Sequence, residues 1–368
     1  MAHLLRFSFC LLLFSFVYGA RELADVSPTG QGVKLPLKKQ GDNYLVTVGF
    51  GTPKLDLMLM VDTGSATTWI KCKPCNTCKP NETLFDPLQS STFSNCSSAN
   101  NCQSNQSLDY HDGSKVDGNS VQDTLTLTSQ VFFPSFEFLC GHNPSGFDEV
   151  EGLLALGLTD NSFIDQTSQA FSQKFGYCLP SSDSSTGFLA FGDEAAAACK
   201  PLFHVSLVLG PKRDNQNYYI NLFAITIGQK ILPMPSSSQK ALLDSGTRKT
   251  HLPPSVYSEL RSSFLELMSE YPIVESGKMC FNLEGHDLST AYIPTITLHF
   301  GDSLDLTLGS PSVVFSDGES NPNSKVCLAF AEDEETIIGS HQLENVNILY
   351  DIANSQVGLS LNPGCGSY

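Results

Sequence analysis

The sequence predicts a mostly β protein that is built from two related lobes and contains only a few short helices. Three observations support this fold class. Short runs of alternating apolar and polar residues recur along the chain, helical periodicity occurs in only two segments, and one aspartate-centred motif occurs twice. At 368 residues the chain is long enough for two lobes that each bury a core.

The regular elements follow from these periodicities. Residues of period two, bounded by turn-forming residues, predict strands at 44–48, 57–61, 124–127, 188–191, 219–222, 296–300 and 346–350. Apolar residues at a spacing of three to four predict helices at 162–175 and at 253–268, the second of which opens with two prolines.

The chain also repeats a pair of landmarks. Asp62-Thr-Gly-Ser follows one apolar strand, and Asp244-Ser-Gly-Thr follows another. At nearly the same distance after each aspartate comes an apolar pair, which is followed by Ala155 in the first copy and by Gly339 in the second. A single Asp-Thr-Gly turn is common, but the ordered repetition indicates two lobes of similar construction.

Composition excludes some classes of partner. Lys and Arg total 21 against 38 Asp and Glu, so the formal net charge is −17. Nucleic-acid binding needs clustered Lys and Arg to contact phosphates, and binding to anionic lipid needs basic patches. We therefore expect neither a nucleic-acid partner nor docking on an anionic membrane.

The N-terminus resembles a targeting segment. Arg6 precedes an apolar run, 7–18, that is too short to span a bilayer and is followed by small or branched residues. We predict that 1–19 is a secretory signal peptide rather than a membrane anchor. The C-terminal residues lack the hydrophobic tail of a lipid-anchor signal. The mature chain is thus expected to be secreted and extracellular, without a membrane anchor.

Secretion determines how the cysteines are interpreted. Twelve are present, and Cys10 leaves with the signal, so an odd number remains. In an oxidising compartment the expectation is disulfides plus one unpaired thiol. Cys72, Cys75 and Cys78 could instead be zinc ligands, but no matching fourth ligand follows. We find no motif for a metal or cofactor.

The polar stretch 81–107 contains three sequons for N-glycosylation, at Asn81, Asn95 and Asn105. Because glycans attach to accessible asparagines, we expect this Ser/Asn-rich stretch to be an exposed loop.

A set of ordered motifs gives the chain a family resemblance. They are residues 48–53 (VGFGTP), 62–69 (DTGSATTW), the Cys72/75/78 cluster, 110–114 (YHDGS), 175–180 (FGYCLP), 244–247 (DSGT), 326–330 (VCLAF) and 337–339 (IIG) through 350–351 (YD). With these motifs the chain resembles the pepsin-like aspartic proteases, and within them the plant nepenthesin-like branch, from about residue 41 to residue 365.

The resemblance implies a bilobed, pepsin-like double β-barrel with a cleft between the lobes. It places the N-terminal lobe at 41–185, an interlobe connection at 186–212 and the C-terminal lobe at 213–368. The segment 20–40 is then either a short N-terminal extension or a vestigial propeptide. Within it, residues 33–39 are either a propeptide fragment or a first strand, and we favour the strand.

It also implies peptide hydrolysis by Asp62 and Asp244. In such proteases the two carboxyl groups, one from each lobe, face each other. Two carboxyl groups in contact cannot both ionise readily, so the pair holds one proton and activates a water molecule. Gly64 and Gly246 are expected to permit the tight turns that present the carboxylates. By the same resemblance, Thr63 and Ser245 cross-brace the two loops, and Ser65 and Thr247 hydrogen-bond the outer carboxylate oxygens.

Tyr110 corresponds to the tyrosine of the flap, the hairpin that closes over substrate. Trp69, the only tryptophan, corresponds to its hydrogen-bond partner, and Asp112 and Gly113 complete the flap turn. His111 replaces the glycine that usually follows the flap tyrosine. It could modulate pH dependence or simply be exposed to solvent.

Two departures from the family pattern concern the cleft floor. Arg248 replaces a serine or threonine; it could lower the pKa of the aspartate pair, attract acidic substrates, block a subsite or point away. Ala155 replaces a glycine and could crowd the first catalytic loop. These departures keep open an alternative, a catalytically weak or inert binding scaffold that resembles xylanase inhibitors. Because both aspartate motifs are intact, we favour an aspartic endopeptidase.

The family's disulfide frame implies the pairs Cys72–Cys75, Cys78–Cys140, Cys178–Cys365 and Cys280–Cys327. Cys96 and Cys102 then pair with each other, and Cys199 is the unpaired thiol. We expect a monomer without cofactor that acts on polypeptides at acidic pH. Its location is expected to be the apoplast, with the vacuole left open.

Overall fold

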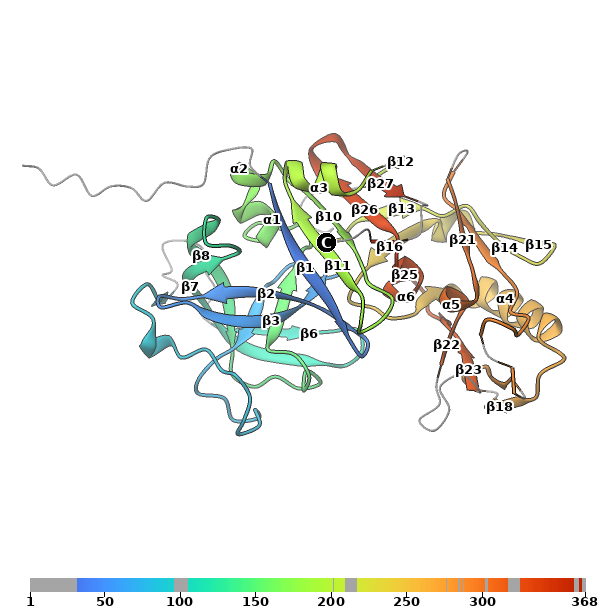
Figure 1. Cartoon of the computed structure of the whole chain (residues 1–368), viewed down its shortest axis with the longest axis horizontal. Helices are drawn as coiled ribbons and strands as arrows, with labels where there is room; N and C mark the ends of the chain where they lie inside the picture. Colours follow the sequence, from blue (N-terminus) through green and yellow to red (C-terminus); the bar gives the residue numbers. More distant parts are fainter. Residues whose placement is uncertain are drawn as a thin grey trace, which may run out of the picture.

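The computed structural model describes residues 32–95, 105–200, 202–208, 217–275, 277–283, 285–286, 288–301, 304–316, 325–360 and 364–365. The predicted signal peptide, most of the segment 20–40 and the expected Cys96–Cys102 pair lie outside these residues. Strands dominate the rest. Figure 1 shows two lobes side by side, the N-terminal one blue to green and the C-terminal one yellow to orange.

The first half of the chain consists mainly of strands. They are β1 (Val33–Gln40), β2 (Asn43–Phe50), β3 (Leu55–Asp62), β4 (Trp69–Lys71), β5 (Ser94–Asn95), β6 (Gln106–Asp109), β7 (Lys115–Thr126), β8 (Phe132–Gly141), β9 (Gly152–Ala155), β10 (Lys174–Cys178), β11 (Thr186–Phe191) and β12 (Phe203–Ser206).

The second half repeats this character. Its strands are β13 (Tyr219–Asn221), β14 (Ala224–Ile227), β15 (Lys230–Pro233), β16 (Lys240–Asp244), β17 (Thr250–Leu252), β18 (Ile273–Glu275), β19 (Cys280–Asn282), β20 (Ile296–His299), β21 (Asp305–Leu308), β22 (Val314–Ser316), β23 (Lys325–Leu328), β24 (Phe330–Glu332), β25 (Thr336–Gly339), β26 (Asn347–Asp351) and β27 (Gln356–Ser360).

The helices are short, apart from one of 14 residues. They are α1 (Phe163–Gln166), α2 (Ser168–Phe171), α3 (Asp193–Ala198), α4 (Pro254–Leu267), α5 (Ser310–Val313) and α6 (Ser340–Leu343), with 3₁₀ turns η1 (Pro87–Gln89), η3 (Ser236–Ser238) and η4 (Ile352–Asn354).

The expected strands are present, but one expected helix is wrong. Helix α4 matches the prediction for 253–268. The segment 162–175, in contrast, forms two single turns, α1 and α2, and then enters β10. Ser172 and Gln173 both take left-handed backbone conformations, with φ of 53° and 52°. A helix cannot continue through such residues, so Phe175 belongs to a strand instead.

The two lobes repeat one strand arrangement. In the first, β3 pairs in parallel with β9, which is flanked by β4 and then β8. In the second, β16 pairs in parallel with β25, which is flanked by β17 and then β24. This repetition places Asp62 beside Ala155 and Asp244 beside Gly339. The repeat found in the sequence is therefore a repeat of structure.

Strands from both halves of the chain join the lobes within one 14-stranded sheet, of which one part has the order β12-β27-β26-β10-β11-β1. Strand β1 pairs with β11 on one side and with β2 on the other, so residues 33–39 form the first strand, as favoured from the sequence. Its Lys39 forms an ion pair with Glu344, which also accepts a hydrogen bond of 2.7 Å from Tyr44 Oη. The lobe boundaries 41–185, 186–212 and 213–368 stay a prediction.

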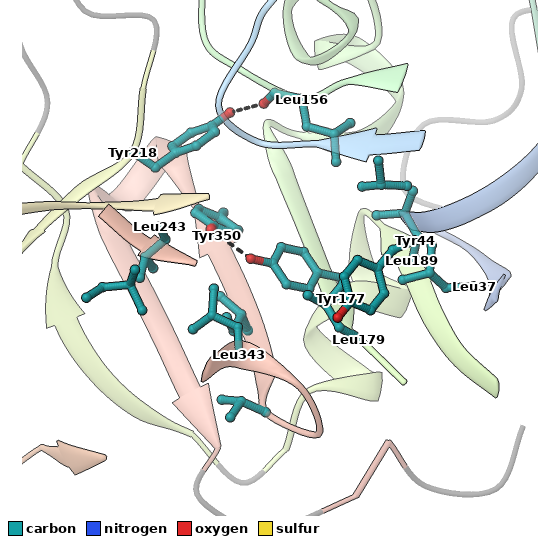
Figure 2. Packing of buried hydrophobic residues seen from close by; sticks show 14 of the residues in the cluster. Leu37, Tyr44, Leu156, Tyr177, Leu179, Leu189, Tyr218, Leu243, Leu343 and Tyr350 are labelled. Carbon is teal, nitrogen blue, oxygen red and sulfur yellow. Dashed lines mark hydrogen bonds between the residues drawn. The ribbon is translucent and has the colours of Figure 1, made fainter. Parts of the chain in front are cut away.

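Buried aromatic residues fill the junction beneath the cleft. Tyr177 from β10 and Tyr350 from β26 point toward each other, with hydroxyl oxygens 3.3 Å apart (Figure 2). Tyr218 donates a hydrogen bond to the carbonyl of Leu156, which directly follows β9, the strand paired with β3. This packing fixes the two lobes against each other and so positions the ends of β3 and β16.

Candidate active site

Asp62 and Asp244 end the equivalent strands β3 and β16 at the floor of a cleft of about 850 Å³ between the lobes. Both are buried, at 5% and 7% exposure. Strands from different lobes supply the two carboxylates, so their approach depends on the packing of the lobes. The cleft reaches up to the hairpin between β6 and β7, which contributes Tyr110 and His111 to its lining.

The two carboxylates have matching hydrogen bonds from their own loops. The backbone N–H of Gly64 donates to Asp62 Oδ1 at 2.7 Å, and Gly246 donates to Asp244 Oδ1 at 2.8 Å.

Two hydroxyls complete the match. Ser65 Oγ donates to Asp62 Oδ2 at 2.6 Å, and Thr247 Oγ1 donates to Asp244 Oδ2 at 2.7 Å. The site is thus close to two-fold symmetric, and both carboxyl groups are fixed in orientation.

Thr63 and Ser245 link the two loops across the lobe boundary. The N–H of Thr63 donates to Ser245 Oγ at 3.1 Å, and the N–H of Ser245 donates to Thr63 Oγ1 at 3.0 Å. Each hydroxyl in turn donates to a carbonyl of the opposite strand, that of Leu243 or of Val61. This is the cross-brace that the family resemblance implies.

The glycines of the two motifs have a role other than the one expected. Neither has a positive φ, so the turn itself does not require glycine. A Cβ on Gly64 would lie 2.7 Å from both carboxylate oxygens of Asp244, and a Cβ on Gly246 would overlap Oδ1 of Asp62. Each glycine therefore makes room for the carboxylate of the opposite lobe.

This crowding changes the acidity of the pair. Burial and the nearby charge of Asp244 raise the pKa of Asp62 to about 7, against the opposing effect of the hydrogen bonds from Ser65 and Gly64. Below that pH the pair holds a proton on Asp62. One carboxyl group that donates beside one that accepts is the arrangement required for general acid–base chemistry on a water molecule.

Tyr110 lies on the flap hairpin, with its hydroxyl accepting a hydrogen bond of 2.8 Å from Trp69 Nε1. Phe147 packs edge-on against both rings. At the hairpin tip Gly113 has a φ of 85°, a conformation that favours glycine, and Asp112 binds both the N–H and the hydroxyl of Ser114. These contacts fix the flap above the aspartates.

Arg248 lines the cleft, and its described side-chain contacts are with residues other than the aspartate pair. Its Nη1 donates to Asp42 Oδ2 in the β1–β2 turn at 2.6 Å, and its guanidinium lies 4.3 Å from the ring centroid of Phe315. Asp42 belongs to the first half of the chain, so this ion pair connects the two lobes. These contacts give Arg248 a structural role at the cleft edge that was not among the alternatives considered from the sequence.

Ala155 leaves the first catalytic loop intact. Its N–H donates to Thr68 Oγ1 at 3.2 Å, as the N–H of Gly339 donates to Thr250 Oγ1 at 3.1 Å. A Cβ on Gly339 would overlap the backbone of Lys249, whereas Ala155 is buried in the same hydrophobic cluster as Trp69. The departure from glycine is therefore accommodated by packing.

Three residues in or beside the cleft escaped sequence reasoning as site residues: Asp42, His251 and Asp333. Asp333 Oδ2 lies 3.3 Å from His111 Nε2 and 3.3 Å from His251 Nδ1. Nothing local in the sequence marks Asp333, because it meets the flap only through the fold. His251 could have been suspected, since it closely follows the second aspartate motif.

Two expected disulfides are wrong. The structure pairs Cys72 with Cys140 and Cys75 with Cys78, instead of Cys72–Cys75 and Cys78–Cys140. The parallel pairing of β4 with β8 aligns Ile70 with Cys140. Cys72 is two residues further along on the same face, so it lies diagonally across from Cys140 with a Cα separation of 5.3 Å. Cys75 and Cys78 close a local turn.

The other expectations for the described cysteines agree with the structure. Cys178 bonds Cys365, Cys280 bonds Cys327, and Cys199 is unpaired and buried. Burial raises the pKa of Cys199 to about 12.

Several further features of the described residues bear on function. Asn81, Asn95 and Asn105 are all exposed. Within the described ranges no cluster of His, Cys, Asp or Glu could hold a metal ion, and no helix is long and apolar enough to cross a membrane.

Comparison with known proteins agrees with this geometry. Family models described as the N-terminal and C-terminal parts of xylanase inhibitors match residues 44–193 and 217–360. Conglutin gamma, a basic 7S globulin from lupine seeds, shares the fold with a TM-score of 0.72 at 18% identity, over 91% of this chain and 96% of its own. The fold and the paired aspartates thus define a bilobed protein of the pepsin-like class.

Sequence relatives identify the family within this class. An aspartyl protease family protein of Arabidopsis thaliana is 38% identical over 354 residues, which are 88% of this chain and 72% of the relative. Aspartic proteinase nepenthesin-2 of Nepenthes gracilis is 29% identical, over 92% of this chain and 81% of the relative. The chain belongs to the pepsin-like aspartic protease family of plants.

Proposed function

We propose that the protein is a secreted aspartic endopeptidase that hydrolyses polypeptides at acidic pH. The observation that carries the proposal is the symmetric, hydrogen-bonded pair of Asp62 and Asp244 at the floor of a cleft covered by a hairpin. The aspartic protease names of the relatives support the same conclusion.

In this mechanism the ionised carboxylate accepts a proton from a water molecule bound between the aspartates. The protonated carboxyl group donates a hydrogen bond to the scissile carbonyl as the water oxygen attacks. The tetrahedral intermediate then collapses as a proton passes to the departing amine. No covalent bond to the protein forms, and the cross-brace of Thr63 and Ser245 keeps the carboxylates in place throughout.

The proposal includes the processing of the chain. We propose that 1–19 is removed as a signal peptide, that glycans occupy Asn81, Asn95 and Asn105, and that the mature protein is an extracellular monomer. The disulfides and the exposed asparagines are compatible with this route. The proposed lobes, 41–185 and 213–368 around a connection at 186–212, each supply one aspartate.

The test is a digest of denatured globin between pH 2 and 7, with and without pepstatin, by the wild type and by Asp62→Asn and Asp244→Asn. We expect cleavage in acid that pepstatin abolishes and that each substitution reduces by orders of magnitude. Circular dichroism spectra of all three proteins would verify that they are folded.

The second candidate function is a binding scaffold without activity. It is favoured by the xylanase-inhibitor family models and by the Arg248–Asp42 ion pair across the cleft. This alternative would be established if the wild type, folded and with its disulfides intact, cleaved no protein substrate but inhibited a xylanase.

A further inference from the structure

We propose that His111, Asp333 and His251 form a latch that holds the flap closed over the cleft when the histidines are protonated. Asp333 Oδ2 lies 3.3 Å from a ring nitrogen of each histidine, and the two rings are 6.1 Å apart. This inference rests on the proposed endopeptidase function, and it makes His111 and Asp333 positioning residues for the flap.

The three side chains come from opposite sides of the cleft. His111 occupies the tip of the flap, next to Tyr110, and its side chain is 68% exposed. His251 lies on β17, a few residues after the second aspartate motif, and Asp333 directly follows β24. The contact therefore connects the flap of the N-terminal lobe to the C-terminal lobe across the cleft that contains the aspartates.

The C-terminal side of the latch is rigidly anchored. Asp333 is only 19% exposed, and its N–H donates to the carbonyl of Leu252 at 3.0 Å, which fixes it to β17. Strand β17 pairs with β25, and β25 pairs with β16, the strand that ends in Asp244. A flap bound to Asp333 is thus fixed in position relative to Asp244, one of the two catalytic carboxylates.

The surroundings of Asp333 favour its charged form. Partial burial opposes ionisation, but hydrogen bonds from the Glu335 backbone and from His251, together with the charge of His111, lower the pKa of Asp333. Histidine in general gains its charge between about pH 8 and pH 5. Protonation of the histidines as the pH falls would therefore create the ion pairs with Asp333, in the direction of the acidic pH proposed for catalysis.

The other charged groups near the latch have partners of their own. Asp112 is bonded to Ser114, and Arg248 and Lys249 lie against the ring of Phe315. The other acidic residues in the same turn as Asp333 are Glu332, Glu334 and Glu335. The backbone N–H groups of Glu334 and Glu335 donate hydrogen bonds to the Asp333 carboxylate.

The first experiment compares the kinetics of the wild type with those of His111→Gln, His111→Lys and Asp333→Asn at pH 4.5. The loss of one partly exposed ion pair should raise KM by roughly two- to fivefold without lowering kcat. His111→Lys keeps a positive charge and should preserve the low KM. Asp333→Asn leaves two cationic rings facing each other and should raise KM more than His111→Gln does. His204→Gln, on an exposed strand outside the cleft, is the matched control.

The second experiment needs no catalysis. Trp69 is the only tryptophan and is bonded to the flap through Tyr110, so its fluorescence reports the position of the flap. In an inactive Asp62→Asn background, the emission should titrate between about pH 5 and 8, and His111→Gln should abolish that transition while His204→Gln retains it.

These two readouts separate failure of the latch from failure of the proposed function. An inactive wild type whose fluorescence still titrates through His111 would overturn the function and leave the latch standing. An active enzyme in which His111→Gln changes neither KM nor the fluorescence titration would refute the latch.

Discussion

Gly64 faces the carboxylate of Asp244 so closely that a Cβ at that position would lie 2.7 Å from both of its oxygens. The same relationship holds in the other direction between Gly246 and Asp62. The glycine of each motif thus leaves space for the carboxylate of the opposite lobe. We therefore expect that both motifs must be intact for either carboxylate to be placed correctly.

This relationship predicts that Gly64→Ala will abolish activity by displacing Asp244. We expect kcat to fall by at least about 100-fold, because a small displacement of a catalytic group is costly. Gly277→Ala is the control, since a Cβ at that exposed position meets nothing within 4 Å. Retention of most of the activity by Gly64→Ala would show that the two loops can move apart without loss.

The raised pKa of Asp62 makes stability depend on pH. In the unfolded chain an aspartate titrates near 3.9, whereas folded Asp62 keeps its proton up to about pH 7. The folded state then binds more protons than the unfolded state, so the free energy of unfolding falls as pH rises from about 4 to about 7. Asp62→Asn should remove this decrease in the free energy of unfolding with rising pH. Asp56→Asn, at an exposed position, is the control and should retain it. Urea unfolding at several pH values measures the free energy of unfolding of each protein.

Arg248→Thr should widen the cleft by removing the ion pair with Asp42. We expect improved kcat/KM for peptides with bulky side chains and an unchanged pH profile, because the guanidinium is bound to Asp42 and Phe315 and not to the aspartate pair. Asp42→Asn, which releases the guanidinium but keeps it in the cleft, should instead favour acidic peptides. A shifted pH profile in Arg248→Thr would show that the arginine acts on the aspartates after all.

Cys199 should resist alkylation in the folded protein. The thiol is buried and its pKa is raised to about 12 by that burial, so almost no reactive thiolate is present. Treatment with iodoacetamide should label Cys199 only after the protein is denatured without reductant, as peptide mass spectrometry can measure. Rapid labelling of the native protein at this residue would indicate an accessible thiol or a different disulfide pattern.

The sequence by itself determined the architecture and the centre of the site. The family resemblance implied that Trp69 bonds Tyr110, and the structure contains this bond. Strand periodicity and the duplicated Asp62 and Asp244 motifs, in contrast, are local patterns, and they appear in the structure as expected. Such features are predictable because the spacing of residues along a strand or a turn fixes which side chains share a face. The assignment of residues 33–39 to a strand belongs to the same group.

The tertiary structure alone decided which distant residues meet. Whether Cys72 bonds Cys75 or Cys140 depends on the alignment of β4 with β8, and spacing in the sequence does not encode that alignment. Likewise, the lobes must pack before Arg248 can reach Asp42 or His111 can reach Asp333. These contacts join residues far apart in the chain, and their geometry is set by the relative position of two folded lobes, which no local pattern specifies.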